Sequence, residues 1–534
     1  MILKLKNMKL TKYIALAIIG TSSLFSCTDY LDTNPTDQIS GNVIFTDVNG
    51  GMIAMNGVYR LMYSSGWAGD NSTHTFGYMS TMLVADFMGD DNIVSSSIKG
   101  WFSMDYNLQE RNFYSSMLYR PYSEWNFYYT IISNLNYILS HEKSLTGLPG
   151  EKDNLFGQAY SLRALCYFYL IQLYQQTYIG HENSPGVPVY TEPTTSSTEG
   201  KPRGTVANVY RQINEDIEKG IGLLKQAEEQ GISQIHKSHI DYYAANGIKA
   251  RIALVQNRWQ DAANAANIAR QKTDLGLADA SELVSGFNDL DMTSVLWGTE
   301  IQKTDQNGAY ASFFCHMDAN AGMHASYDRK CISAWLYKQM GIQDIRRNNW
   351  WKGNIAPALE QTQGPQKSYC TTKFRFSEYS SYLGDNIYMR AEEMLLIEAE
   401  ALCRLKNYDQ ARTLMKDFGS IREKNYVKNR LDKVTDSNEM TLDIYGTVST
   451  PEIKTLLDEI LLQRRIELWG ETGRIFDVLR LKAGYTRDYE GSNHIVKLSD
   501  NTKIPDYKGF ILTLPQSEFD GNVNMDPVAD QNPL

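Results

Sequence analysis

The segment GQAYSLRALCYFYLIQLY, residues 157–174, is the stretch of the 534-residue chain that decides the fold class. Apolar side chains lie on most sides of a helix drawn through it, and Arg163 is its one charged residue. A helix that is apolar nearly all round is typical of a protein interior, because on the surface it would expose that apolar area to water. We therefore expect a deeply buried helix and a mostly α fold.

The segments on either side of this stretch also carry helical patterns. Residues 125–139 repeat apolar side chains at spacings of three and four, which places on one face Trp125, Tyr128, Ile132, Leu135 and Leu139. Pro121 lies just before this segment, where a helix tolerates proline. Four prolines and many hydroxyl residues predict a long loop at 180–204. Thr205 is the predicted N-cap of the helix that follows the loop.

Two later segments resemble each other and indicate pairs of helices. ARIALVQNRWQDA (250–262) and AEALCRLKNYDQA (399–411) both contain alanines, a break, an aromatic residue and another alanine three residues on. This resembles the tetratricopeptide helix pair, in which small residues let two antiparallel helices approach each other. Trp259 and Tyr408 are then wedges beside the turns. Since the two copies lie far apart in the sequence, we expect several pairs to meet around a common core.

The amino end has the pattern of an exported protein. Four lysines, at positions 4, 6, 9 and 12, precede the apolar core YIALAIIG, which is far shorter than the ~20 residues of a membrane-spanning helix. LFSC, residues 24–27, resembles the lipobox of bacterial lipoproteins, and this resemblance implies cleavage before Cys27 and acylation of that cysteine. A plain secretory signal with a chance cysteine is the alternative. Either Met1 or Met8 is the start.

Composition excludes several classes of function. A net charge of −10 argues against a nucleic-acid partner. The five cysteines after Cys27 are widely spaced and form no CxxC pair, so we predict neither a disulfide scaffold nor a zinc site. We expect most of them to be small buried residues. The chain is rich in aromatic residues, with 34 Tyr and 9 Trp, which are large, flat and amphipathic side chains.

Six landmarks together resemble one known family, the SusD-like (SusD/RagB) outer-membrane lipoproteins of Bacteroidetes. In chain order they are AMNGVYRLMY (54–63), the segment 157–174 with Arg163 and Ala164, PGVPV (185–189), YMRAEEMLLIEAEAL (388–402), ILLQRRIELWGETGRIFDVLR (460–480) and LPQSEFDGNVNMDPVADQNPL (514–534). They cover nearly the whole chain. The chain departs from the family pattern at two places. Gln463 stands where the family usually has Glu, and the chain ends in QNPL. The first departure puts a local ion pair in doubt.

The resemblance implies a fold and an organisation. The expected fold is mostly α, with a tetratricopeptide-like scaffold of helical pairs and a loop-rich, partly β ligand-binding insertion. The expected parts are a signal peptide (1–26), an acylated cysteine with a flexible tether (27–40), a helical part (41–285), the insertion (286–385), and a second helical part with the terminal segment (386–534). Within the insertion, CISAWLYKQM predicts a helix.

The resemblance also implies a function, which is capture of an oligosaccharide or polysaccharide at the surface of the outer membrane. The implied partner is a SusC-like TonB-dependent transporter. No cofactor and no catalysis are expected. Capture of a peptide, as in some relatives, is the second hypothesis, and a glycan-degrading enzyme is the third.

Aromatic residues in loops are the candidates for contact with such a ligand. A sugar ring has an apolar C–H face and a rim of hydroxyl groups, so it is held by a flat aromatic ring and by planar polar side chains. The residues that meet this description are Trp67, Asp70, Asn71, His74, Trp101, Tyr106, Trp297, Tyr310 and Trp350. Trp125, Trp259, Trp335 and Trp469 lie within helical patterns and are expected in the core.

The charged residues of segment 460–480 suggest catalysis at first sight, but their spacing favours structural ion pairs. Arg464, Glu467, Arg474, Asp477 and Arg480 recur at spacings of three within their helices, which places opposite charges side by side. Arg163 and Glu393 are interpreted in the same way.

Patterns of known catalytic and metal sites are weak or missing. The sequence contains neither a G-x-S-x-G elbow nor a phosphate-binding loop. His236 and His239 are three residues apart but lack a His-Glu-x-x-His context. His316 and His324 flank Asp318 and Asn320, whose oxygens suit calcium, although the EF-hand spacing is missing. We therefore predict no metal ligand.

Overall fold

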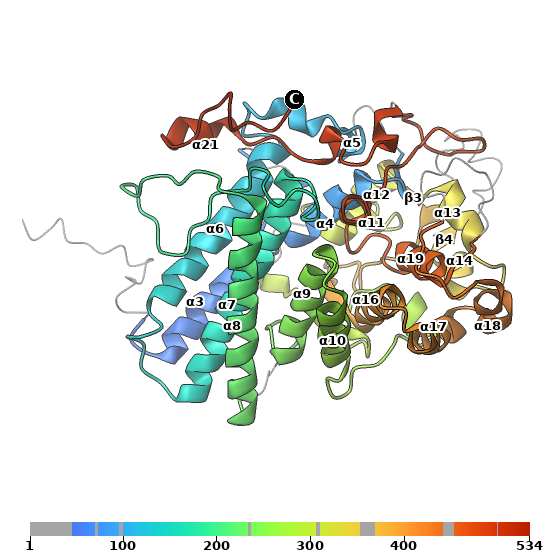
Figure 1. The fold of residues 1–534 in the computed structure, drawn as a ribbon, viewed down its shortest axis with the longest axis horizontal. Helices are drawn as coiled ribbons and strands as arrows, with labels where there is room; N and C mark the ends of the chain where they lie inside the picture. The colour runs from blue at the N-terminus through green and yellow to red at the C-terminus, as the bar shows by residue number, and fades with distance from the viewer. Residues whose placement is uncertain are drawn as a thin grey trace, which may run out of the picture.

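The computed structural model describes residues 45–69, 73–95, 100–232, 236–305, 310–352, 369–441, 453–498 and 500–534. Helices dominate these ranges, as the sequence predicts. The three longest, α6 (Arg120–Ser140), α7 (Pro149–Tyr174) and α8 (Val206–Glu229), lie side by side on one side of the molecule (Figure 1). The predicted signal peptide and tether, with Cys27, lie outside the described residues.

Helix α7 contains the segment 157–174 and is buried as predicted. From Leu155 to Tyr174 every residue except Tyr160 is buried. Helix α6 packs on one side of α7 and helix α8 on another. The predicted N-cap is confirmed, since the Thr205 side chain accepts a hydrogen bond from the backbone N–H of Asn208 (3.2 Å).

Two glycines allow α7 and α8 to approach each other closely. A Cβ added to Gly220 would lie 2.3 Å from Ser161 Oγ and 3.0 Å from the carbonyl oxygen of Gly157. A Cβ added to Gly157 would lie 2.7 Å from Leu224 Cγ. Because backbone atoms form part of both contacts, the helices would have to separate to admit a side chain.

We expect Gly220→Ala and Gly222→Ala to change stability in opposite directions. Gly222 lies in the same helix, two residues on, with nothing within 4 Å of its added Cβ. Alanine there should raise the free energy of unfolding by about 0.5–1 kcal/mol, because it restricts the unfolded chain and favours helix. Alanine at 220 should lower it by roughly 1–3 kcal/mol through overpacking. Chemical unfolding of both variants tests this, and a stabilised Gly220→Ala protein would contradict the close contact.

The two resembling segments form helix pairs, as predicted. A short turn connects helix α9 (Tyr242–Val255) to α10 (Trp259–Arg270), and another connects α16 (Ala391–Arg404) to α17 (Tyr408–Arg422). Asn257 and Lys406 occupy equivalent positions in the turns, and both have left-handed backbones (φ 55° and 65°), which is a common way to end a helix. Trp259 and Tyr408 begin the second helices and are partly buried against the core.

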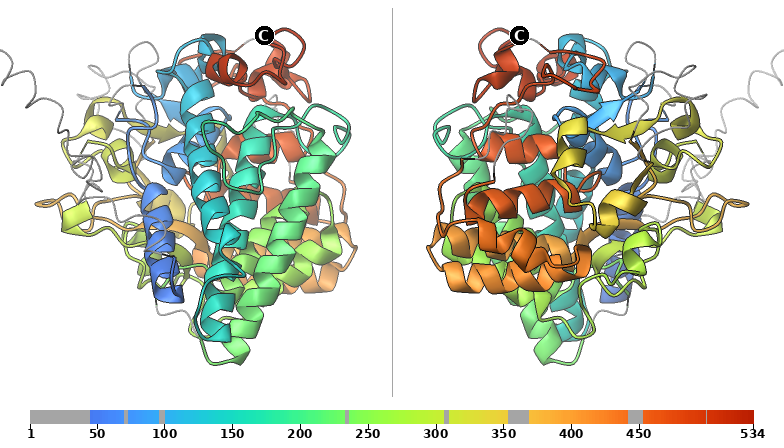
Figure 2. Two further views of the ribbon diagram at one scale, coloured as in Figure 1. Left: turned by 90° about the vertical axis from the view of Figure 1, so that its left-hand side faces the viewer. Right: turned by 90° about the vertical axis from the view of Figure 1, so that its right-hand side faces the viewer.

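The pairs meet in space although they are far apart in the sequence. Helix α10 packs against α16, which also contacts α19 (Leu456–Glu467). Helices α16, α17 and α19 lie together on one side of the molecule, the side that faces the viewer in the right-hand view of Figure 2. One hydrophobic cluster contains residues from Val48 in α3 (Val48–Leu61) to Met525 near the carboxyl end. The predicted common core is therefore confirmed.

The remaining elements are short. Before α6 they are α4 (Tyr78–Phe87), β1 (Asn92–Val94), α5 (Ser103–Tyr106) and η2 (Glu110–Phe113). Between α10 and α16 they are η3 (Glu282–Val284), β2 (Val295–Thr299), η4 (Lys303–Asp305), α11 (Phe313–Met317), α12 (His324–Tyr327), β3 (Lys330–Ile332), α13 (Ala334–Gln339), α14 (Ile345–Asn349), β4 (Trp351–Lys352), β5 (Cys370–Thr371) and β6 (Asn386–Arg390). After α17 they are α18 (Tyr426–Asn429), η6 (Leu431–Lys433), α20 (Arg474–Arg480), η7 (Asp500–Lys503), η8 (Lys508–Phe510) and α21 (Gln516–Gly521).

The strands form two small antiparallel sheets. One has the order β1-β3-β5-β4 and joins the chain before α6 to the predicted insertion, with Asn92 opposite Ile332. The other pairs β2 with β6. Helix α13 coincides with the helix that CISAWLYKQM predicts. The five cysteines of the described residues are free and buried, which agrees with the expectation for most of them.

The charges of segment 460–480 form structural ion pairs, as predicted, but their partners differ in part from the expected ones. Asp477 pairs with Arg480 within α20 (2.6 Å). Arg464 reaches across to Asp477 (2.9 Å) and does not pair with Glu467 in its own helix. Arg163 and Glu393 are also in buried pairs, with Asp216 (2.6 Å) and Arg251 (2.6 Å) respectively.

Glu467 lies at the centre of a buried cluster of charges. Its carboxylate contacts three guanidinium groups, those of Arg346 (3.0 Å), Arg390 (3.3 Å) and Arg422 (3.1 Å). These three cations hold the pKa of Glu467 well below its ordinary value, against the opposing effect of burial. Gln463, the departure noted in the sequence, accepts from Arg346 (2.6 Å) and donates to Glu459 (2.8 Å). Gln463 therefore makes hydrogen bonds at the position where a glutamate would make an ion pair.

Candidate functional site

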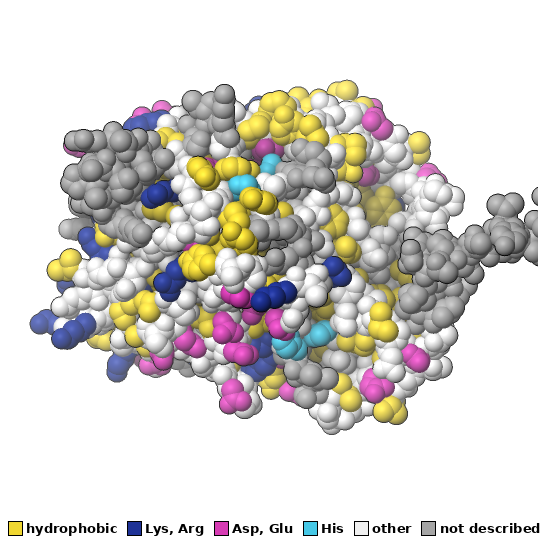
Figure 3. All heavy atoms as spheres, turned by 180° about the vertical axis from the view of Figure 1, so that it is seen from behind, with side chains coloured by type: hydrophobic (Ala, Val, Ile, Leu, Met, Phe, Trp, Pro, Cys, Tyr) yellow, Lys and Arg dark blue, Asp and Glu magenta, His cyan; other side chains and the backbone are white. Residues whose placement is uncertain are grey.

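An aromatic patch at the surface brings together two of the predicted ligand-binding residues. The ring of Trp101 stacks on His324, with centroids 3.8 Å apart and planes inclined by 30°. Tyr310, which is 58% exposed, lies 5.8 Å from the same histidine ring. We call Trp101, Tyr310 and His324 the aromatic patch. Seen from behind, histidines lie among hydrophobic side chains in the upper half of the molecule (Figure 3).

The backbone explains why Trp101 is at the surface. Phe102, directly before α5, has a left-handed backbone (φ 67°), which is uncommon for a residue with a side chain. Phe102 is turned into the core and is 3% exposed, whereas Trp101 is partly buried. The guanidinium of Arg120 lies over the Phe102 ring, 5.1 Å from its centroid. This packing fixes the turn that presents Trp101.

A second layer of rings supports the patch from below. His316 lies 4.9 Å from His324 and stacks on Phe76 (5.5 Å, 13°). Its Nε2 donates to the carbonyl oxygen of Thr73 (2.9 Å), which fixes the ring. His74, another predicted site residue, lies 5.7 Å from the Phe102 ring and so belongs to this layer. The patch is therefore backed by packed rings.

His324 in the patch, and His316 and His74 in the layer beneath it, are neutral at pH 7. Burial lowers the pKa of His316 well below 6.5, and Lys330 lowers it further. Burial also lowers the pKa of His324, and burial together with Arg120 lowers that of His74 well below 6.5. The patch is thus an uncharged surface of stacked rings.

We expect His316→Gln to change how stability depends on pH. In the wild-type protein the pKa of His316 is lowered on folding, so its contribution to stability is complete above the unfolded value near 6.5 and is lost as the pH falls below that value. Below that value the unfolded chain binds one proton at this histidine that the folded protein does not bind. This difference makes the free energy of unfolding fall by up to about 1.4 kcal/mol for each pH unit. The variant should lack this part of the slope between pH 6 and 5.

The control for this slope is His236→Gln, on an exposed ring. Urea unfolding of the three proteins at pH 7, 6 and 5 gives the slopes. Equal slopes for the wild-type protein and His316→Gln would contradict a buried neutral ring at position 316.

Four of the predicted ligand-binding residues are buried, which corrects their assignment. Tyr106, Trp297 and Trp350 are each 0% exposed, and Trp67 is 9% exposed. Tyr106 bonds to His494 Nδ1 (2.8 Å), and Trp67 donates to the carbonyl oxygen of Ser64 (2.8 Å). Trp297 donates to Ser238 (3.3 Å) and Trp350 to Leu283 (2.5 Å). These rings pack into the core, so they offer no open face to a ligand. Asp70 and Asn71 lie outside the described residues.

The candidate metal-binding side chains already have protein partners. Asp318 accepts from the backbone N–H groups of Asn320 (2.9 Å) and Phe376 (3.0 Å), one on each carboxylate oxygen. His236 contacts Glu300 (3.1 Å), whereas His239 contacts Asn56 (2.8 Å). Within the described ranges, no three His, Cys, Asp or Glu side chains are grouped so that they could hold a metal ion.

Comparison with known families identifies the protein class. A family model described as the SusD family matches residues 240–533, which is more than half of the chain. The chain belongs to the SusD family. A second model, described as "Starch-binding associating with outer membrane", matches residues 29–254 of this SusD-family protein. No curated protein matches the chain. Among the described residues, no helix combines the length and apolar character needed to cross a membrane.

Solved structures show the same fold. A SusD-like carbohydrate-binding protein from Bacteroides vulgatus is 22% identical with a TM-score of 0.73, and the match covers 92% of this chain and 99% of that one. A SusD superfamily protein from Bacteroides thetaiotaomicron is 21% identical (TM-score 0.72, 91% and 100% covered). A laminarin-binding SusD-like protein is 17% identical (TM-score 0.62, 92% and 100% covered). The expected mostly α, SusD-like fold is confirmed.

The sequence did not point to His324 as a partner of Trp101. His324 follows Asp318 and Asn320 at short distance, and this pattern suggests a calcium site instead. The stacked pair joins two segments more than 200 residues apart, and no local pattern marks it. Tyr310 and Trp101, in contrast, were found as aromatic residues in loops.

Proposed function

We propose that this SusD-family protein is a lipid-anchored receptor of the outer membrane that captures a neutral or basic oligosaccharide at the aromatic patch. It delivers this cargo to a SusC-like TonB-dependent transporter and does not cleave it. The observation that carries the proposal is the stacked pair of Trp101 and His324 beside the exposed ring of Tyr310.

The chemistry of the patch suits a sugar ring. The apolar C–H face of a pyranose covers a flat ring, and burial of ~100 Å² of apolar surface stabilises the complex by about 2–3 kcal/mol. The neutral histidines add no charge that would select an anion. Because the lower layer of rings is already packed, little order is lost on binding, which favours a preformed site.

The proposed anchor is the acyl group on Cys27. More than one acyl chain gives stable attachment to a membrane. The polar residues 28–40 would act as a leash between the membrane and the folded domain. Metabolic labelling with a palmitate analogue tests the anchor, and Cys27→Ala is the variant that should lose the label.

Two carboxyl groups with raised pKa values, Asp86 and Glu110, are too buried to act as the acid of a hydrolase. A glycosidase acid needs a raised pKa and access to the substrate. Burial raises the pKa of Asp86 and of Glu110, each to about 8, but the two residues are 3% and 6% exposed. Neither group is therefore exposed enough to protonate a glycosidic oxygen.

A binding and cleavage assay tests the proposal. The chain from residue 28 onward is passed through gels that contain single polysaccharides, with laminarin first because one structural relative is described as binding it. We expect retention by at least one neutral glycan without new reducing ends. New reducing ends would contradict the non-catalytic role. Retention by peptides in place of glycans would favour the second hypothesis.

A further inference from the structure

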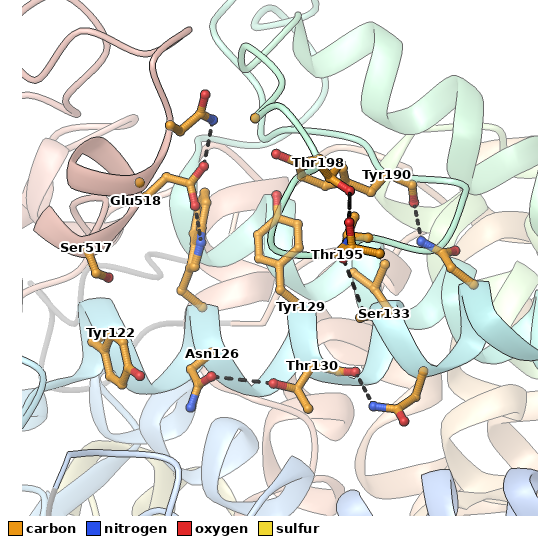
Figure 4. Close-up of a pocket in the computed structure, with 18 residues that line it drawn as sticks. Tyr122, Asn126, Tyr129, Thr130, Ser133, Tyr190, Thr195, Thr198, Ser517 and Glu518 are labelled. Carbon is orange, nitrogen blue, oxygen red and sulfur yellow. Dashed lines mark hydrogen bonds between the residues drawn. The ribbon is translucent and has the colours of Figure 1, made fainter. Parts of the chain in front are cut away.

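A hollow of about 500 Å³ lies on helix α6, away from the aromatic patch. Its walls come from three segments, which are α6, the loop after α7 and α21 (Figure 4). None of the three residues of the aromatic patch lines it. Its volume falls within the ~300–1,000 Å³ of typical small-molecule sites. The hollow is therefore large enough to hold a ligand.

Most side chains in the hollow are aromatic or uncharged and polar, and the exceptions are the aliphatic Ile132 and the charged Glu518. Those of α6 and the loop include Tyr122, Asn126, Tyr129, Thr130, Ser133 and Tyr190. Glu518 of α21 is the single charged residue among the lining residues. This composition provides flat apolar faces next to hydroxyl and amide groups.

The loop wall is held in place by partly buried hydrogen bonds. Tyr129 donates its hydroxyl to the carbonyl oxygen of Pro188 (2.7 Å). Asn136, which is 1% exposed, donates to the carbonyl oxygens of Tyr190 (3.0 Å) and Glu192 (3.2 Å). The loop that carries Tyr190 is thus fixed on α6, and the hollow exists before any ligand arrives.

On the wall formed by α21, uncharged groups donate hydrogen bonds to the one charged lining residue, Glu518. Glu518 accepts from the indole N–H of Trp125 (3.1 Å) and from the side-chain amide of Asn522 (2.8 Å). Asn522 also donates to the carbonyl oxygen of Lys201, which joins α21 to the end of the loop (2.9 Å). Because each carboxylate oxygen already has a donor, the hollow does not require a cationic ligand.

We propose that this hollow is a second binding site, for a short neutral saccharide, separate from the aromatic patch. The ligand class in this proposal rests on the proposed function. The location of the site rests on the residues of α6, the loop and α21 that line the hollow. An uncharged ligand with hydroxyl groups matches the amides and hydroxyls, and its C–H faces match the tyrosine rings. No Lys or Arg lines the hollow, and the ammonium group of Lys201, 5.5 Å from the centroid of the Tyr190 ring, already donates to the carbonyl oxygen of Val189 (3.0 Å).

The test uses two tryptophan substitutions on α21, called the plug variants, of which one fills the hollow and the other is its matched control. Ser517→Trp places a large ring at an exposed lining position, whereas Asp520→Trp places the same ring at an exposed position of the same helix that does not line the hollow. Maltose, cellobiose and laminaribiose are titrated into the wild-type protein, both plug variants and Trp101→Ala. Hydrogen exchange is followed at residues 190–200 and 516–522.

We expect at least one disaccharide to slow exchange at both segments in the wild-type protein, in Asp520→Trp and in Trp101→Ala. Ser517→Trp should lose this protection and bind at least ten-fold more weakly at that site. Unchanged protection in Ser517→Trp, or no protection by any disaccharide, would overturn the second site. Protection by uncharged tripeptides alone would overturn its saccharide class.

The two proposals fail in different ways. If binding of long glycans depends on Trp101 and the two segments are never protected, the receptor role stands and the second site is wrong. If the segments are protected but Trp101→Ala retains every glycan, the second site stands and the aromatic patch is wrong as the capture surface.

Discussion

Replacement of Trp101 by alanine should weaken glycan binding by roughly 50-fold. The loss of ~100 Å² of apolar contact removes about 2.5 kcal/mol, and each 1.4 kcal/mol is a factor of ten. Trp101→Phe keeps a flat ring and should recover part of the affinity. Isothermal titration with the glycan that the gels identify measures both values.

The control for this effect is Tyr137→Ala. Tyr137 is 39% exposed on α6 and lines neither the aromatic patch nor the hollow. It should bind glycan with the wild-type affinity. Thermal unfolding of Trp101→Ala checks that the loss is local, because His324 also loses its stacking partner. Wild-type affinity in a folded Trp101→Ala protein would exclude the patch as the main platform.

Replacement of Glu467 by glutamine should lower the free energy of unfolding by about 3–5 kcal/mol. Glu467 is 0% exposed, and its removal leaves a positive charge in excess among Arg346, Arg390 and Arg422. A buried charge without its partner costs this amount because it cannot regain its hydration. Urea unfolding at pH 7 measures the change.

A surface pair provides the matched control. Glu215 lies 4.0 Å from Arg211 in an exposed i,i+4 pair on α8, so Glu215→Gln should change stability by about 0.5 kcal/mol or less. A change below about 1 kcal/mol in Glu467→Gln would contradict the central role of Glu467. The wild-type contribution persists far into the acid range, because the pKa of Glu467 is lowered on folding and the contribution is lost only as the pH falls through that lowered pKa.

The helical scaffold could be predicted because it follows from local patterns. The all-round apolar character of segment 157–174, the cap at Thr205 and the alanine–aromatic pattern of the two helix pairs each act within a few turns of helix. The three partners of Glu467 could not be predicted in this way. Arg346, Arg390 and Arg422 come from three separate segments, and spacing within α19 indicated Arg464 instead.

The candidate site was harder to predict because the polar and glycine residues around Trp297 and Trp350 hide short elements of structure. Trp297 lies within strand β2 and Trp350 lies between α14 and β4, and both rings are buried and hydrogen-bonded to backbone. The hollow on α6 was missed for another reason. Its polar residues on α6, Tyr122, Asn126, Thr130 and Ser133, recur at spacings of three and four beside the apolar face that identifies the helix, and two residues of that apolar face, Trp125 and Ile132, also line the hollow.

The account depends most directly on where the retained glycan lies. A crystal structure of the chain from residue 28 onward, grown with the oligosaccharide that binds best in solution, measures this. The account predicts an uncleaved sugar with one ring over Trp101 and contacts to Tyr310. A sugar bound elsewhere with an empty aromatic patch, or a cleaved product, would contradict it.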